Sequence, residues 1–316
     1  MDTIPSSPSS LGVFDMIKRS FSIYKSFFGR FLGYLVFQLL LIGVIIFGFL
    51  FSLISTLGSL ETALANPAGF ATAFPALIGK SAGLFLVFVI FYLLIVLVGA
   101  WFSAAHTLTA NRGYSLEPQN SWSGTLKEAT SYLNKLFPAL LLLTIFVQGP
   151  SYAVSLLKWR FASLALINPT AFASISLLLS IASLAASLYS IYASIKLVFC
   201  QFTIVVEQTK IMDGFRRSMQ LVSGRWWETF GRIMAFNSLL GLAFFVIVIL
   251  ELIFTFKDPG IMIIALFVTF LLFLALTPLV FVYLTVVYNE YRKVPAPVSP
   301  AAIPPAPMQI PPTPQI

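Results

Sequence analysis

Long apolar stretches, separated by short charged segments, run through the chain from residue 31 to residue 289. Five of them contain no charged residue (31–60, 81–111, 136–157, 161–195 and 259–289), and a sixth, 233–250, is shorter. Each of the five reaches the roughly 20 residues that a helix needs to cross the hydrocarbon core of a membrane. Helices are expected because backbone groups find no water in lipid, and because these stretches lack the apolar–polar alternation of barrel strands.

The pattern predicts an all-α integral membrane protein with six transmembrane helices, over residues 31–55, 82–107, 136–157, 173–195, 231–256 and 261–288. Composition agrees, since 9% of the residues are charged, against about 25% in soluble domains. We expect a disordered N-terminal tail over 1–11 and a membrane domain over 12–293. Residues 294–316 should form a disordered, extended cytoplasmic tail, because their nine prolines cannot continue a helix.

Positive charge is distributed unevenly between the two sides that these spans define. Of the 19 Lys and Arg residues, 15 fall in segments on the side of the N-terminus and 4 on the opposite side. Because cytoplasmic segments retain positive charge, both termini are predicted to be cytoplasmic, in the cell membrane. No cleavable signal peptide is expected, since the first apolar run begins only at residue 31 and is too long for a signal sequence.

Charge concentrates in residues 210–232, between the fourth and fifth spans. Apolar residues recur there at helical spacing: Ile211, Phe215, Met219 and Val222. This spacing predicts a short amphipathic helix at the membrane surface, ended by Gly224. Similar segments precede the first and third spans when 17–20, 126–129 and 215–218 are aligned. We interpret the chain as three pseudo-repeated hairpins, each preceded by an amphipathic interfacial helix.

Basic and aromatic residues of these segments are the candidate contacts to lipid headgroups. Lys and Arg are attracted to anionic headgroups, and Trp favours the headgroup zone. The candidates are Lys18, Arg19, Lys25, Arg30, Lys127, Arg216, Arg217, Arg225, Trp226, Trp227 and Arg232. In the alternative interpretation, the arginines only direct topology and cap helix ends. Membrane lipids are the expected partners. A protein could bind the PxxP spacings of the C-terminal tail, and no nucleic-acid partner is expected.

Six polar residues lie within or beside the predicted spans: Gln38, Gln148, Lys196, Glu207, Asn237 and Glu251. Charges inside a membrane are costly and often functional. On a continuous helix Lys196 and Glu207 would lie about three turns apart, so Lys196 should extend to the cytoplasmic surface or pair with another helix. The side-chain amides of Gln38, Gln148 and Asn237 are expected to hydrogen-bond between helices. Lys257 or Arg160 should neutralise Glu251, and Pro150 should kink the third span.

Two segments carry a resemblance to a known family: "IKRSFSIYKSFFGRFLG" from residue 17 and "VVEQTKIMDGFRRSMQLVSGRWWETFGRIM" from residue 205. With the six-span layout, they resemble the membrane domain of prokaryotic glycerophosphodiester phosphodiesterases and its stand-alone relatives of unknown function, over about residues 12–290. The most specific matches are Glu207, Arg217–Ser218, Gly224 and Trp227. In that family the hydrolase is a separate soluble domain, so the resemblance implies the membrane fold without the phosphodiesterase activity.

The residues needed for hydrolytic chemistry are missing from this sequence. It contains a single histidine, His106, and a single cysteine, Cys200, with scattered acids and no phosphate-binding glycine loop. We expect a packed or interfacial His106, a buried and inert Cys200, and no metal, cofactor or enzymatic activity. The favoured function is a lipid-interacting scaffold or assembly platform. The alternative is a transporter or channel for a small solute or lipid, which would need a polar path through the bundle.

Overall fold

The computed structural model describes residues 11–64, 70–162, 169–255 and 259–293, and every regular element in these ranges is an α-helix. Six of the helices are long: α2 (Phe28–Leu64), α3 (Phe70–Ser115), α5 (Leu133–Phe161), α7 (Pro169–Leu197), α10 (Trp226–Thr255) and α11 (Pro259–Lys293). Four are short: α1 (Val13–Ser26), α4 (Trp122–Thr130), α8 (Cys200–Val206) and α9 (Ile211–Val222). The predicted tails, apart from Leu11, and Lys257 lie outside the described residues.

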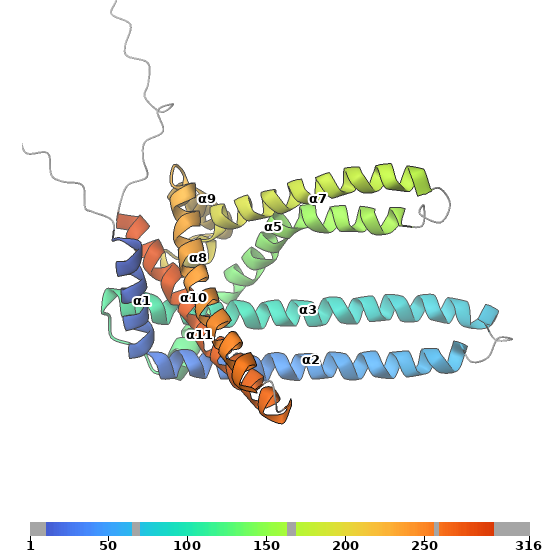
Figure 1. Ribbon diagram of the computed structural model, residues 1–316, viewed down its shortest axis with the longest axis horizontal. Helices are drawn as coiled ribbons and strands as arrows, with labels where there is room; N and C mark the ends of the chain where they lie inside the picture. The colour runs from blue at the N-terminus through green and yellow to red at the C-terminus, as the bar shows by residue number, and fades with distance from the viewer. Residues whose placement is uncertain (1–10, 65–69, 163–168, 256–258, 294–316) are drawn as a thin grey trace, which may run out of the picture.

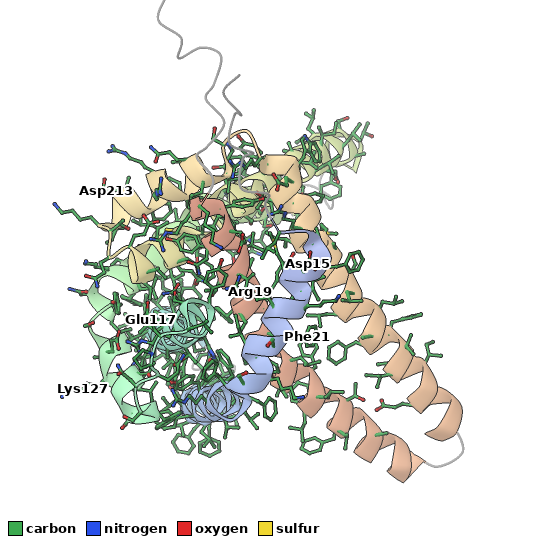
Figure 2. All side chains as sticks on the ribbon, turned by 90° about the vertical axis from the view of Figure 1, so that its left-hand side faces the viewer. Asp15, Arg19, Phe21, Glu117, Lys127 and Asp213 are labelled. Carbon is green, nitrogen blue, oxygen red and sulfur yellow. The ribbon has the colours of Figure 1, made fainter. Side chains whose placement is uncertain are left out.

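The long helices form three antiparallel pairs, α2 with α3, α5 with α7, and α10 with α11 (Figure 1). The first two pairs extend in the same direction, and the third diverges from them (Figures 1 and 2). The short helices gather where the pairs begin, together with the end of α11 (Figures 1 and 2). We call this region the basal end. α5 changes direction along its length, which fits the missing N–H of Pro150 inside it.

The prediction of an all-α protein with six apolar helices is confirmed. Six helices of the described ranges are long and apolar enough to cross a membrane, each overlapping one predicted span. Their distal parts expose large apolar side chains such as Phe47, Phe51 and Phe85, each at least 70% exposed. Such surfaces are unfavourable in water and suit contact with lipid tails. The core lies at the basal end, where Phe31, Tyr34, Phe199 and other aromatic side chains are fully buried.

One sequence-based expectation about the short helices is wrong. The helix that contains Lys196 does not continue to Glu207, because α7 ends at Leu197 and α8 begins at Cys200. Ser218 of α9 stabilises this break: its hydroxyl donates to the carbonyl of Lys196 (3.0 Å) and accepts the N–H of Phe199 (3.1 Å). The side chain thereby satisfies backbone groups that the interrupted helix leaves unpaired.

The apolar faces of α1 and α9 pack largely on the protein. The sequence predicts amphipathic helices at the membrane surface, and much of the apolar face of each is buried by the protein. On α1 the buried residues are Met16, Ile17, Ser20, Ile23 and Tyr24, and on α9 they are Gly214, Phe215, Ser218, Leu221 and Val222. α9 ends as expected, since Gly224 adopts a positive φ of 73° just beyond it.

Candidate functional site

The last two turns of α11 connect most elements of the basal end. The hydroxyl of Tyr288 donates to Glu207, which follows α8, over 2.7 Å. The amide of Asn289 donates to Asn111 of α3 over 3.1 Å. Consecutive residues of the helix point in different directions, so Tyr288, Asn289 and Glu290 reach different neighbours. This part of α11 therefore holds the basal end together.

Glu207 is the centre of one ion-pair cluster. Its carboxylate lies 3.3 Å from Nε of Arg217 on α9 and 3.3 Å from Nε of Arg292 on α11, and it accepts the Tyr288 hydroxyl. The Glu207 side chain is 18% exposed, whereas the two arginines are about 40% exposed. Glu207 thus ties α9 to α11 at the rim of the core, and it does not pair with Lys196.

Glu290 is the centre of a second cluster and is only 5% exposed. Its carboxylate accepts hydrogen bonds from the hydroxyl of Tyr114 at the end of α3 (2.5 Å) and from Nζ of Lys293 (3.0 Å). Arg19 of α1 approaches it to 3.8 Å, and the Arg19 guanidinium lies 3.9 Å above the Tyr114 ring. This cluster fixes α1 to α3 and α11.

The placement of Arg232 corrects its prediction as a contact to lipid headgroups. Its side chain is 8% exposed, pairs with Glu228 at 2.5 Å, and lies 5.2 Å above the Tyr291 ring. Arg30 is also engaged by the protein, since it donates to the carbonyl of Asn120 over 2.8 Å. Both side chains therefore have partners within the protein, and Arg232 is also buried away from the surface.

The aligned positions of the three segments have similar burial. The first aligned position is buried and the last is fully buried in each: Ile17, Leu126 and Phe215, then Ser20, Ala129 and Ser218. The second position is an exposed cation in each: Lys18, Lys127 and Arg216. The third carries a charge whose partner lies in another segment: Arg19 with Glu290, Glu128 with Arg112, and Arg217 with Glu207. In each segment, the charged residue at the third position therefore pairs within the protein, and the cation at the second position is exposed.

The outer face of α1 combines aromatic and basic residues. Phe14, Lys18, Phe21 and Lys25 follow at intervals of four, three and four residues, which places them on one side of the helix. Phe14 is 78% exposed and Phe21 41%, and both lysines are exposed. Figure 2 looks onto the basal end, with α1 crossing the front of the molecule and Lys127 at its edge. We refer to these four residues as the outer face of α1.

The two tryptophans differ in their surroundings. Trp227 is 77% exposed, while Trp226 stacks on Phe230 and donates its ring N–H to the carbonyl of Tyr192 over 3.3 Å. Arg225, beside them, lies 5.5 Å above the Tyr291 ring. Trp227 is thus the one of the pair whose ring is largely available outside the protein.

The predicted intramembrane polar residues do not form one site. Asn237 lines a cavity of about 620 Å³ between α10 and α11. Gln148 lines a cavity of about 440 Å³ between α5, α7, α8 and α11, and Lys196 one of about 310 Å³ between α5, α7 and α9. Glu251 accepts a hydrogen bond from Thr269 of α11, and Gln38 lies on α2 outside these three cavities.

His106 and Cys200 are both buried in the part of the chain that the structure describes. The His106 ring stacks between Phe31 and Phe281 at centroid distances of 5.7 and 5.3 Å. No group of three His, Cys, Asp or Glu residues that could hold a metal ion occurs in the described ranges. Outside the spans, burial raises the pKa of Tyr24 to about 12, and its hydroxyl donates to the carbonyl of Ala275. Burial also raises the pKa of Tyr132.

Two features of the basal end were not identified from the sequence. The spacing of Phe14 and Phe21, with Lys18 between them and Lys25 after them, could have indicated the outer face of α1. The cluster around Tyr288, Asn289 and Glu290 gave no such signal, because its partners come from segments far apart in the chain.

A comparison with known families gives one match. A family model described as a domain of unknown function (DUF7847) matches residues 125–294, which is more than half of the chain. No curated protein and no solved structure matches the chain.

Proposed function

The chain belongs to this family of unknown function, and we propose that it is a non-enzymatic multi-pass membrane protein whose basal end binds anionic lipid headgroups, serving as a lipid-bound scaffold. The resemblance to the membrane domain of glycerophosphodiester phosphodiesterases stays a prediction. The basal end holds most of the cations of the chain, and we propose that it faces the cytoplasm across the cell membrane.

The outer face of α1 is the observation that carries this proposal. The opposite face of α1 is already buried by the protein, so the exposed phenylalanines are not needed for the core. A helix surface that met only water would be expected to carry polar residues in their place. Aromatic rings alternating with lysines instead suit the membrane interface, where rings enter the headgroup zone and cations meet phosphates.

The exposed cations at the aligned positions extend this surface beyond α1. Lys18, Lys127 and Arg216 lie on three different helices of the basal end and are exposed. Each cation near an anionic membrane contributes about 1 kcal/mol at low salt. We infer that α1, α4 and α9 are pseudo-equivalent interfacial helices, each presenting one such cation, while the neighbouring charge holds the helix on the protein.

The transport alternative has less support. A path for a solute needs polar groups along one continuous cavity. The candidates Gln148, Lys196 and Asn237 each line a different cavity, and the largest of these three is mostly lined by apolar residues. Lipid contact at the basal end therefore accounts for more of the observed arrangement.

Lipid selectivity in reconstituted bilayers tests the proposal. The full-length protein is placed in phosphatidylcholine bilayers that contain a trace of spin-labelled phosphatidylglycerol or phosphatidylcholine. Electron spin resonance then gives the fraction of each label that the protein immobilises. We expect phosphatidylglycerol to associate several-fold more strongly, and this preference to shrink at high salt and in the double variant Lys18→Gln/Lys25→Gln.

The matched control is Lys158→Gln/Arg160→Gln, which removes two exposed cations near the distal end of α5. This variant should keep the preference for phosphatidylglycerol. Equal association of the two lipids with the wild-type protein would refute the proposal, as would an equal loss of preference in both double variants.

A further inference from the structure

The cavity of about 310 Å³ between α5, α7 and α9 has the composition of an amphiphile site. Its lining includes Phe146, Tyr189, Tyr192, Met212 and Met219, and a single charged residue, Lys196. We refer to it as the Lys196 cavity. Its walls come from three helices that the break at residues 198 and 199 brings together, since Ser218 holds α9 against the end of α7.

Lys196 lacks an acidic partner among the residues that the structure describes. No carboxylate of these residues is within 4.0 Å of its Nζ, which lies 5.8 Å above the Tyr192 ring. Arg19, Arg217 and Arg292, by contrast, each have a carboxylate partner at the basal end. Lys196 is partly buried among aromatic and methionine side chains, so an anion bound there would be screened less by water than at an open surface.

The Lys196 cavity has a charged end and an apolar end. Lys196 is in the last turn of α7, at the basal end, and Tyr189 lies seven residues earlier. At 1.5 Å per residue this is about 10 Å further along the helix, towards the distal end. Phe146, Tyr192 and Met219 are between 43% and 50% exposed, so the cavity opens at the side of the protein. Its charged end thus lies at the basal end and its apolar part extends along α7.

We propose that the Lys196 cavity binds one anionic phospholipid, with its phosphate at Lys196 and the start of one acyl chain against Phe146, Tyr189 and Met219. A volume of about 310 Å³ accommodates a headgroup and part of a chain, and the rest of the lipid stays in the bilayer. The flexible thioethers of Met212 and Met219 allow chains of different shape. Arg216, one helical turn from both methionines and exposed, supplies a second cation at the rim.

This site rests on the proposed orientation of the basal end towards headgroups, but it differs from the diffuse contact at α1. It holds one lipid in a defined place, whereas the outer face of α1 would exchange lipids freely. The two can be separated by variants, because Lys196 is not part of the outer face of α1.

Native mass spectrometry of the full-length protein in detergent tests the site, with phosphatidylglycerol and phosphatidylcholine titrated separately. We expect the first phosphatidylglycerol to bind at least tenfold more tightly than phosphatidylcholine. Lys196→Gln should weaken this first binding about tenfold, and Lys196→Arg should retain it. Met219→Trp, which fills the cavity, should weaken it as well. The control Lys210→Gln, an exposed cation before α9, should have no effect.

Equal binding of phosphatidylglycerol by the wild-type protein and by Lys196→Gln would overturn this proposal, as would displacement of the bound lipid by millimolar inorganic phosphate. Lys18→Gln/Lys25→Gln should lose the selectivity measured in bilayers and keep the single tight lipid, whereas Lys196→Gln should do the reverse. A wild-type protein that lacks bilayer selectivity but keeps one lipid dependent on Lys196 would contradict only the proposed function.

Discussion

Replacing Glu207 by Gln tests whether the ion-pair cluster at the end of α11 holds the basal end together. The substitution keeps the size of the side chain and removes its charge. Arg217 and Arg292 then lose their carboxylate partner, and Tyr288 keeps only a neutral acceptor. The packing of α8 against α9 should change little, so the effect reports on the charge.

The size of the effect follows from the exposure of the partners. A hydrogen bond to a charged group contributes about 1.5 to 3 kcal/mol, of which a neutral amide would keep roughly half. Each ion pair contributes at most about 1 kcal/mol, because the arginines are about 40% exposed and solvent screens them. Glu207→Gln should therefore lower the free energy of unfolding by about 1 to 3 kcal/mol.

The assay is reversible unfolding of the purified protein by SDS in mixed micelles, followed by tryptophan fluorescence. The matched control is Asp213→Asn, since Asp213 faces the neighbouring Arg216 at 4.0 Å and both side chains are exposed. It should change the free energy of unfolding by no more than about 0.5 kcal/mol. In a double-mutant cycle, Arg217→Gln and Glu207→Gln should be less than additive, because they remove the same interaction. A Glu207→Gln effect as small as that of Asp213→Asn, or full additivity in the cycle, would refute the reasoning.

Three further outcomes can be measured with the same protein. His106→Phe should keep or slightly raise the free energy of unfolding, because the ring stacks between Phe31 and Phe281 and its buried Nδ1 has no hydrogen-bond partner in the described residues. His106→Ala should lower the free energy of unfolding by about 2 to 4 kcal/mol through the cavity it creates. An equally large loss in His106→Phe would contradict the conclusion that His106 acts only through packing. Gly113→Ala should cost about 1 to 3 kcal/mol, since its methyl group would lie 2.8 Å from side-chain atoms of Ile23 and Phe27 at the end of α1. The control Gly99→Ala, a helical position with open space around it, should keep or slightly raise the free energy of unfolding. In intact cells, an impermeant thiol reagent should label Lys158→Cys and leave Ser123→Cys of α4 unlabelled, with little background from the buried Cys200; the reverse pattern would invert the proposed topology.

The sequence predicted the helices well because the rule behind them is local. A run such as 31–60 without charge can cross lipid only as a helix, whatever its neighbours are. The break between Leu197 and Cys200 escaped this rule. Nothing in the apolar run around it signals an interruption, and the hydroxyl that stabilises the break belongs to Ser218, about twenty positions away.

The sequence also indicated which segments carry the candidate site, but not the role of each residue in it. Arg216 and Arg217 are neighbours of the same chemical type, and the sequence assigns both to lipid. Only the folded chain separates them, since Arg217 reaches Glu207 and Arg216 remains exposed. Arg232 was misassigned for the same reason, because Glu228 and Tyr291 enclose it.

By itself, then, the sequence determined the membrane class, the positions of the six apolar helices and the side on which positive charge gathers. These properties depend on length, hydropathy and charge within single segments. The tertiary structure alone decided which face of α1 and α9 is buried, which cations have acidic partners and which polar residues share a cavity. Those outcomes depend on pairs of residues such as Tyr114 with Glu290 or Asn111 with Asn289, whose distance in space is fixed by packing and is independent of their separation along the chain.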